Sequence, residues 1–221
     1  MELEEVIRQV TAILDSGINR VGFVSPSHFV LHVKIIINCI LSLGYKPVWV
    51  YNSNGYDKPE ILRSLEGMLD VYLPDFKYME TALSYEYSDA LDYPEVAARA
   101  LKEMFRQKGA TLLFGKDGTA ESGMIIRHLV LPGHKENSMK VLNFIAEELS
   151  PKLYISLMSQ YYPTPRVNCH PKLKNTVSGE EYALILSELD RLGMYNGWIQ
   201  ELSSTSDYRP DFEREHPFDK F

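Results

Sequence analysis

Hydrophobic positions along the chain form two kinds of segment, helical stripes and short apolar runs. Residues 3–14 place their apolar side chains on one face of a helix that Gly17 ends, and the run 21–24 is typical of a buried strand. This alternation continues to residue 200. It predicts further helices over 29–43, 58–67, 80–87, 94–107, 138–149 and 179–192, and further strands over 47–51, 70–73, 124–131, 153–157 and 197–200.

Strands that alternate with helices of this length indicate βα units and a parallel α/β sheet. Because the strands are continuous apolar runs, we expect both faces of the sheet to be covered. The chain opens with a helix, whereas a (β/α) barrel usually opens with a strand. We therefore expect a first strand to be missing and the edge at 21–24 to be exposed. Residues 1–202 should form this unit.

Residues 203–221 are predicted to be an extended C-terminal tail, attached to the surface through Tyr208, Phe212, Phe218 and Phe221. Composition fits one globular domain of 221 residues, since 45% of them are hydrophobic. The net charge of −7 argues against a nucleic-acid or anionic-membrane partner. No apolar run reaches the length of a membrane span, and the acidic N-terminus does not resemble a signal peptide.

The two cysteines, Cys39 and Cys169, have no partner at metal or redox spacing, which favours a reducing cytoplasm. Ligands of parallel α/β proteins bind at the carboxyl ends of the strands. There the chain carries Ser25-Pro-Ser-His28, Asn52-Ser-Asn-Gly55, Pro74-Asp-Phe-Lys77 and Ser159-Gln-Tyr-Tyr162. Each of these ends is polar or charged, so we expect a polar small-molecule site among them.

Asp75 and Lys77 are two residues apart and point the same way if the extended geometry continues. Arg127 lies within an apolar strand and needs a partner. Two interpretations are open for Arg127: a structural ion pair with Asp75, or binding of a carboxylate or phosphorylated ligand together with Lys77. For His28 and His128, a satisfied polar role is the more common one.

Five segments in sequence order carry a family resemblance: VGFVSPSHFV, PVWVYNSNGYDKPEILRSLEGMLDVYLPDFKYM, SDALDYPEVAARALKEM, GMIIRHLVLPGH and YISLMSQYYP. Together they resemble the radical SAM proteins related to the pyruvate formate-lyase activating enzyme. The resemblance implies a partial (β/α)6, TIM-like barrel that binds S-adenosylmethionine beside a [4Fe-4S] cluster. It also implies an oxidoreductase activity, in which a 5′-deoxyadenosyl radical abstracts hydrogen from a partner, in the activating enzymes a glycine.

The resemblance assigns ligand contacts to the strand ends. Asp75 and Lys77 match an Asp-x-Lys motif near the methionine carboxylate, and Arg127 matches an arginine that approaches the same ligand. Gln160 stands where a late-strand histidine often meets it.

The two earlier strand ends match further family motifs. Asn52, Ser53 and Asn54 match an Asp-Thr-Asn-Gly segment that helps to hold a monovalent cation, with Asn52 in place of the aspartate. Ser25, Ser27 and His28 stand where many members carry Gly-Gly-Glu for the methionine amine.

The family holds its cluster with Cys-x3-Cys-x2-Cys after the first strand, and this chain lacks that motif. We therefore expect a fragment or shortened gene product that is inactive alone, with the [4Fe-4S] cluster present only in the complete protein. A glycyl-radical-type protein is the expected partner. One alternative is a (β/α) barrel lyase that uses Lys77 as a Schiff-base amine. Another is a non-catalytic interaction module that forms a homodimer through the exposed edge.

Overall fold

A computed structural model describes residues 2–203, and its helices and strands follow the predicted alternation. The α-helices are α1 (Leu3–Asp15), α2 (Val30–Ser42), α3 (Pro59–Arg63), α4 (Thr81–Ser88), α5 (Tyr93–Lys108), α6 (Lys135–Phe144) and α7 (Gly179–Arg191). The strands are β1 (Arg20–Val24), β2 (Val48–Ser53), β3 (Val71–Pro74), β4 (Leu113–Phe114), β5 (Ala120–Leu129), β6 (Tyr154–Met158) and β7 (Gly197–Ile199). Short helical turns are η1 (Pro26–His28), η2 (Ile145–Leu149) and η3 (Pro165–Val167).

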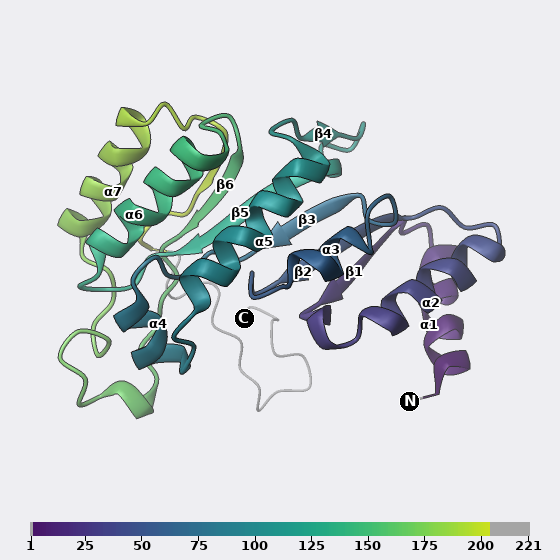
Figure 1. Ribbon diagram of the computed structural model, residues 1–221, viewed down its shortest axis with the longest axis horizontal. Coiled ribbons are helices and arrows are strands. Elements are labelled where there is room, and N and C mark those ends of the chain that lie inside the picture. The colour runs from purple at the N-terminus through teal and green to yellow at the C-terminus, as the bar shows by residue number, and fades with distance from the viewer. Residues whose placement is uncertain (1, 204–221) are drawn as a thin grey trace.

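The strands form one seven-stranded sheet in the order β1-β2-β3-β5-β6-β7, with β4 paired to β5 off this path. All neighbours along the path are parallel, so the predicted parallel α/β fold is confirmed. The spatial order follows the chain without a reversal. Because crossovers between parallel strands are right-handed, each connecting helix is placed on the same face of the sheet. Figure 1 shows α3, α5 and α6 in front of the strands that they connect.

This topology corrects the expectation that both faces of the sheet are covered. In β2 the side chains alternate: Trp49, Tyr51 and Ser53 are buried on the side of the helices, whereas the other three residues, Val48, Val50 and Asn52, are only half-buried. The same alternation runs along β6. With the helices confined to one face, the opposite face stays partly open. We call it the inner face; among its residues are Val50, Asn52, Asp75, Lys77 and Arg127.

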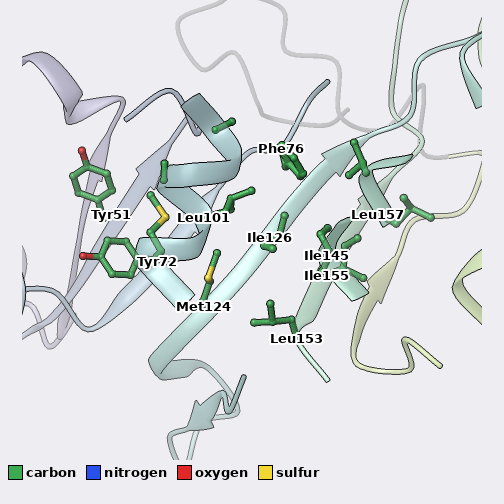
Figure 2. Close-up of a cluster of buried hydrophobic side chains, with 14 of the residues drawn as sticks. Tyr51, Tyr72, Phe76, Leu101, Met124, Ile126, Ile145, Leu153, Ile155 and Leu157 are labelled. Atoms are coloured by element: carbon green, nitrogen blue, oxygen red, sulfur yellow. The ribbon is translucent and has the colours of Figure 1, made fainter. Parts of the chain in front are cut away.

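The hydrophobic core lies between the helices and the covered face of the sheet. Figure 2 shows strand residues Tyr72, Met124 and Ile126 beside Leu101 of α5. These four side chains are at most 1% exposed, and each buried side chain of this size contributes on the order of 2 kcal/mol. The core therefore holds β3 and β5 firmly in place; β3 leads directly to Asp75, and β5 carries Arg127 near its end.

Two local features differ from the predicted elements. The strand predicted to begin at 124 starts at Ala120, because β4 folds back on it as an antiparallel hairpin. Asp117 in that hairpin forms an ion pair with Arg20 of β1, at 3.0 Å. The helix predicted over 138–149 begins at Lys135 and passes into the π-helical turn η2. A two-residue strand has too little hydrophobic periodicity to be recognised in the sequence.

Strand β1 pairs with β2 on one side only within the described part of the chain, which agrees with the predicted exposed edge. Val24, at its end, is 74% exposed. The predicted tail, with Tyr208, Phe212, Phe218 and Phe221, lies outside the described residues, apart from Ser203 at its start. Its attachment and the domain division at 202 stay predictions.

Candidate functional site

Asp75, Phe76 and Lys77 continue the extended chain beyond the end of β3. The amide of Asp75 donates to the carbonyl of Ser53 at 2.9 Å, and the amide of Phe76 donates to the carbonyl of Arg127 at 2.8 Å. Asp75 also bridges to Arg127 in parallel register. This pairing places the Asp75 and Lys77 side chains together on the inner face, as their spacing predicted.

Arg127 forms the structural ion pair with Asp75 that the sequence left open as one interpretation. Its Nη2 lies 2.6 Å from Asp75 Oδ1, and its Nε donates to the same oxygen at 2.8 Å. Nη2 also donates to Asn52 Oδ1 at 2.8 Å. Asn52 stands where the resemblance expects an aspartate near a monovalent cation. In this chain the guanidinium bridges the Asn52 and Asp75 oxygens.

Lys77 carries a second positive charge at the same place. Its Nζ lies 3.7 Å from Asp75 Oδ2, a looser contact than the one Arg127 makes, and its side chain is 42% exposed. Asp75 therefore neutralises Arg127 at close range and leaves the Lys77 ammonium accessible to an anion. The Schiff-base alternative needs a desolvated amine, and this exposure gives it no support.

A cavity of about 310 Å³ opens beside these charges. This volume is at the lower end of the range for small-molecule sites. Its far wall comes from β6 and the residues after it, where the Gln160 Oε1 accepts from Gln200 Nε2 at 2.9 Å. The lining residues are Asp75, Lys77, Tyr78, Arg127, Leu129, Leu131, Met158 and Gln160. The cavity thus combines a cationic end with an apolar wall.

Ser53 and Asn54 shape the loop after β2. The buried Ser53 hydroxyl accepts from the amide of Gly55 at 3.0 Å, and Asn54 Oδ1 accepts from the amide of Tyr56, also at 3.0 Å. The structure thus gives both side chains turn-forming contacts, and neither lines the cavity. Their predicted ligand role stays a prediction.

Ser25, Ser27 and His28 lie at the end of β1, outside the cavity. Ser25 adopts a left-handed conformation, with φ of 51°, and its amide donates to the carbonyl of Asn52 at 2.8 Å. His28 is exposed, with its ring 4.6 Å from that of Phe29. The structure connects this segment to Asn52 through the backbone, and the predicted amine contact is untested.

His128 has the satisfied polar role that is usual for a buried histidine. It is fully buried, and its Nδ1–H donates to the carbonyl of Phe76 at 2.7 Å. In the neutral ring Nε2 then accepts from the Ser138 hydroxyl at 2.9 Å. Burial lowers the pKa of His128 to about 4, so the ring is neutral near pH 7. His128 therefore stabilises the backbone at Phe76, between Asp75 and Lys77.

Sequence reasoning missed two buried residues at this site, Tyr93 and Asn137. The Tyr93 hydroxyl contacts the loop after β2 and the end of β3, and Asn137 contacts the backbone after Lys77. Signals were present: Tyr93 precedes a proline at a helix start, and Asn137 lies in the first turn of α6. Neither signal predicts which strand end the side chain will contact.

The cysteines do not fit an iron–sulfur cluster. Cys39 is half-buried in α2, and Cys169 is exposed in the loop before α7. A [4Fe-4S] cluster takes its ligands from a set of thiolates that two cysteines cannot supply. Within residues 2–203 there is also no group of three or more His, Cys, Asp or Glu side chains that could hold a metal ion. No helix in the same range is long and apolar enough to cross a membrane.

No family model matches the sequence. An uncharacterized protein of Methanocaldococcus jannaschii is 29% identical over 160 residues, which cover 71% of this chain and 43% of that protein. The match thus spans less than half of the length of this curated relative.

Two solved structures share the fold. One is a domain of a pyruvate-formate lyase-activating enzyme from Bacteroides vulgatus, with a TM-score of 0.55 and 15% identity, covering 82% of this chain and 98% of that one. The other is HydG, a maturase of the [FeFe]-hydrogenase, with a TM-score of 0.53 and 15% identity, covering 94% of this chain and 47% of that one. The chain therefore shares its fold with these two proteins, which agrees with the fold that the resemblance of its motifs implies. At this identity the likeness concerns the fold alone.

Proposed function

We propose that the cavity beside Lys77 binds the amino-acid end of S-adenosylmethionine. The observation that carries this proposal is the accessible Lys77 ammonium at the rim of a cavity whose other cation, Arg127, is already paired. Two positive charges and one negative charge leave a net charge of about +1, which one carboxylate neutralises. The radical SAM-like fold supports this choice among carboxylate ligands.

The remaining lining suits the rest of such a ligand. Leu129, Leu131 and Met158 form an apolar wall against which the methylene groups beside the sulfonium can pack. The Gln160 amide adds a polar group on the same side. With its carboxylate held by Lys77, the ligand would therefore extend along an apolar surface.

Reductive cleavage is proposed only for a complete protein, because the residues of this chain do not fit a [4Fe-4S] cluster. Such a cluster, supplied elsewhere, would provide the electron that cleaves S-adenosylmethionine to methionine and a 5′-deoxyadenosyl radical. A glycyl-radical-type protein is the proposed recipient. For this chain we propose ligand binding and no turnover.

Calorimetric titration of the chain with S-adenosylmethionine tests the proposal. We expect weak binding, with a Kd between about 10 μM and 1 mM, because one side of the ligand is left without its cluster contacts. Lys77→Met should weaken binding about tenfold or more, since it removes a charge-assisted contact. Lys152→Met, an exposed lysine before β6 and outside the cavity, is the matched control and should bind like the unchanged chain.

Absence of binding at millimolar ligand, or equal loss in both lysine variants, would overturn the proposed site. A submicromolar Kd would show that this chain forms the whole pocket. That result would contradict the proposal, which assigns part of the ligand contacts to a cluster outside this chain.

A further inference from the structure

Both backbone polar groups of Lys77 are bound by buried side chains from two different helices. Its amide donates to the Tyr93 hydroxyl oxygen at 3.1 Å, and its carbonyl accepts from Asn137 Nδ2 at 3.0 Å. Tyr93 is the first residue of α5, and Asn137 lies in the first turn of α6. We infer that Tyr93 and Asn137 are positioning residues that fix the Lys77 ammonium at the cavity. This inference deepens, and rests on, the proposed ligand site.

The Tyr93 hydroxyl joins two segments that carry site residues. It donates to the carbonyl of Asn54 at 2.9 Å and lies 3.2 Å from the carbonyl of Asp75. One hydroxyl thus connects the loop after β2 to the extended chain after β3. Burial raises the pKa of Tyr93 above the usual range of a phenol, so this hydroxyl keeps its proton and remains a donor.

Aromatic neighbours hold the Tyr93 ring in place. Tyr56 stacks on it with a centroid distance of 5.9 Å, and Tyr78 meets it edge to face at 5.5 Å. Tyr93 is 4% exposed. A ring enclosed in this way has little rotational freedom, and its hydroxyl is therefore a rigid anchor for Lys77.

Asn137 holds the turn that follows Lys77. While its Nδ2 donates to the Lys77 carbonyl, its Oδ1 accepts from the amide of Met79 at 2.8 Å and from that of Glu80 at 3.3 Å. An amide side chain can donate through its nitrogen and accept through its oxygen at once. Asn137 therefore fixes the chain on both sides of Tyr78, which itself lines the cavity.

These anchors matter because the Lys77 side chain has no strong anchor of its own. A lysine side chain is long and flexible, and the contact with Asp75 is loose at 3.7 Å. The position of the ammonium then depends largely on the position of the Lys77 backbone, from which the side chain extends. A displaced backbone would move the ammonium away from the ligand carboxylate without changing its charge.

A double-mutant cycle separates positioning from a general structural role. Tyr93→Phe removes only the hydroxyl, and we expect it to lower the affinity for S-adenosylmethionine about fivefold, the equivalent of one neutral hydrogen bond. In a Lys77→Met background it should have no further effect. Affinities in the millimolar range can be followed by NMR shift changes. An equal loss in both backgrounds would overturn the inference.

Tyr72→Phe is the matched control. Tyr72, in β3, is a buried tyrosine as Tyr93 is. Its hydroxyl donates one hydrogen bond to Gln107 Oε1, at 2.7 Å, and neither residue lines the cavity. We expect this variant to lose stability as Tyr93→Phe does and to keep the affinity of the unchanged chain. An equal loss of affinity in both tyrosine variants would contradict a specific role for Tyr93.

A second measurement needs no ligand. The NMR signal of the Lys77 side-chain Cε, assigned by its loss in Lys77→Met, should shift in Tyr93→Phe and in Asn137→Ala and stay in place in Tyr72→Phe. An unchanged signal in both anchor variants would overturn the inference. If S-adenosylmethionine fails to bind while the signal shifts as expected, the proposed function fails and the positioning of Lys77 stands.

Discussion

Gly55 lies against the backbone carbonyl of Asp75 with no room between them for a side chain. A Cβ at Gly55 would overlap that carbonyl oxygen and would lie 3.3 Å from the Tyr93 hydroxyl. Gly55 also has a positive φ of 80°, which disfavours other residues. The loop after β2 can therefore approach Asp75 only because residue 55 is a glycine.

Gly55→Ala should destabilise the protein by about 2–4 kcal/mol in urea unfolding, since it combines a steric overlap with an unfavourable φ. Gly44→Ala is the matched control: Gly44 has a similar φ of 92° and open space around it. It should cost about 1 kcal/mol from backbone conformation alone. Equal costs for the two variants would show that the contact with Asp75 has no consequence.

The Arg127–Asp75 pair should show a measurable coupling energy. The two side chains are 28% and 18% exposed, so water screens them incompletely. A double-mutant cycle with Asp75→Asn and Arg127→Gln is expected to give about 1–2 kcal/mol of coupling in unfolding free energy.

The pair Lys102–Glu148 offers a comparison, because it is as short, at 2.7 Å, and about half-exposed. Its coupling should stay below about 0.5 kcal/mol. If the Arg127–Asp75 coupling is no larger than this, the pair does not hold the site together.

Stability should fall as the pH drops from about 6.5 to 4 because of His128. Burial lowers the pKa of His128 from 6.5 to about 4 in the folded chain, so in this window the unfolded chain binds more protons. The loss should approach about 3 kcal/mol at the acid end and be absent at neutral pH. His128→Gln should flatten this pH dependence, measured by urea unfolding at each pH. The exposed His32→Gln should leave it unchanged, and a full slope in His128→Gln would contradict the assignment.

The exposed edge at β1 is expected to mediate self-association. Val24 and Leu31 are both 74% exposed there, beside a strand with a free pairing side within the described residues. Size-exclusion chromatography at high protein concentration should show a dimer that Val24→Lys abolishes. Leu184→Lys, at an exposed position of α7, should leave the dimer intact. A monomer at every concentration would contradict this prediction.

Much of the site follows from local spacing. Asp75 and Lys77 share a face because extended chain repeats every two residues, and Arg127 needed a partner because it interrupts an apolar strand. Tyr93 and Asn137 could not be found in this way. Their contacts join helix starts to a strand end 16 and 60 residues away in the sequence, and no periodicity encodes such a distance.

Apart from the two-residue strand β4, the sequence by itself determined the order of strands and helices, the parallel sheet and the polar strand ends, because these follow from local patterns along the chain. Only the tertiary structure decided that the helices share one face, since that depends on strand order and on the right-handedness of each crossover. It also decided that Arg127 forms the close ion pair with Asp75, so that the Lys77 ammonium stays accessible. That division depends on distances of 2.6 Å and 3.7 Å between atoms of three residues, which exist only once β3 and β5 lie side by side.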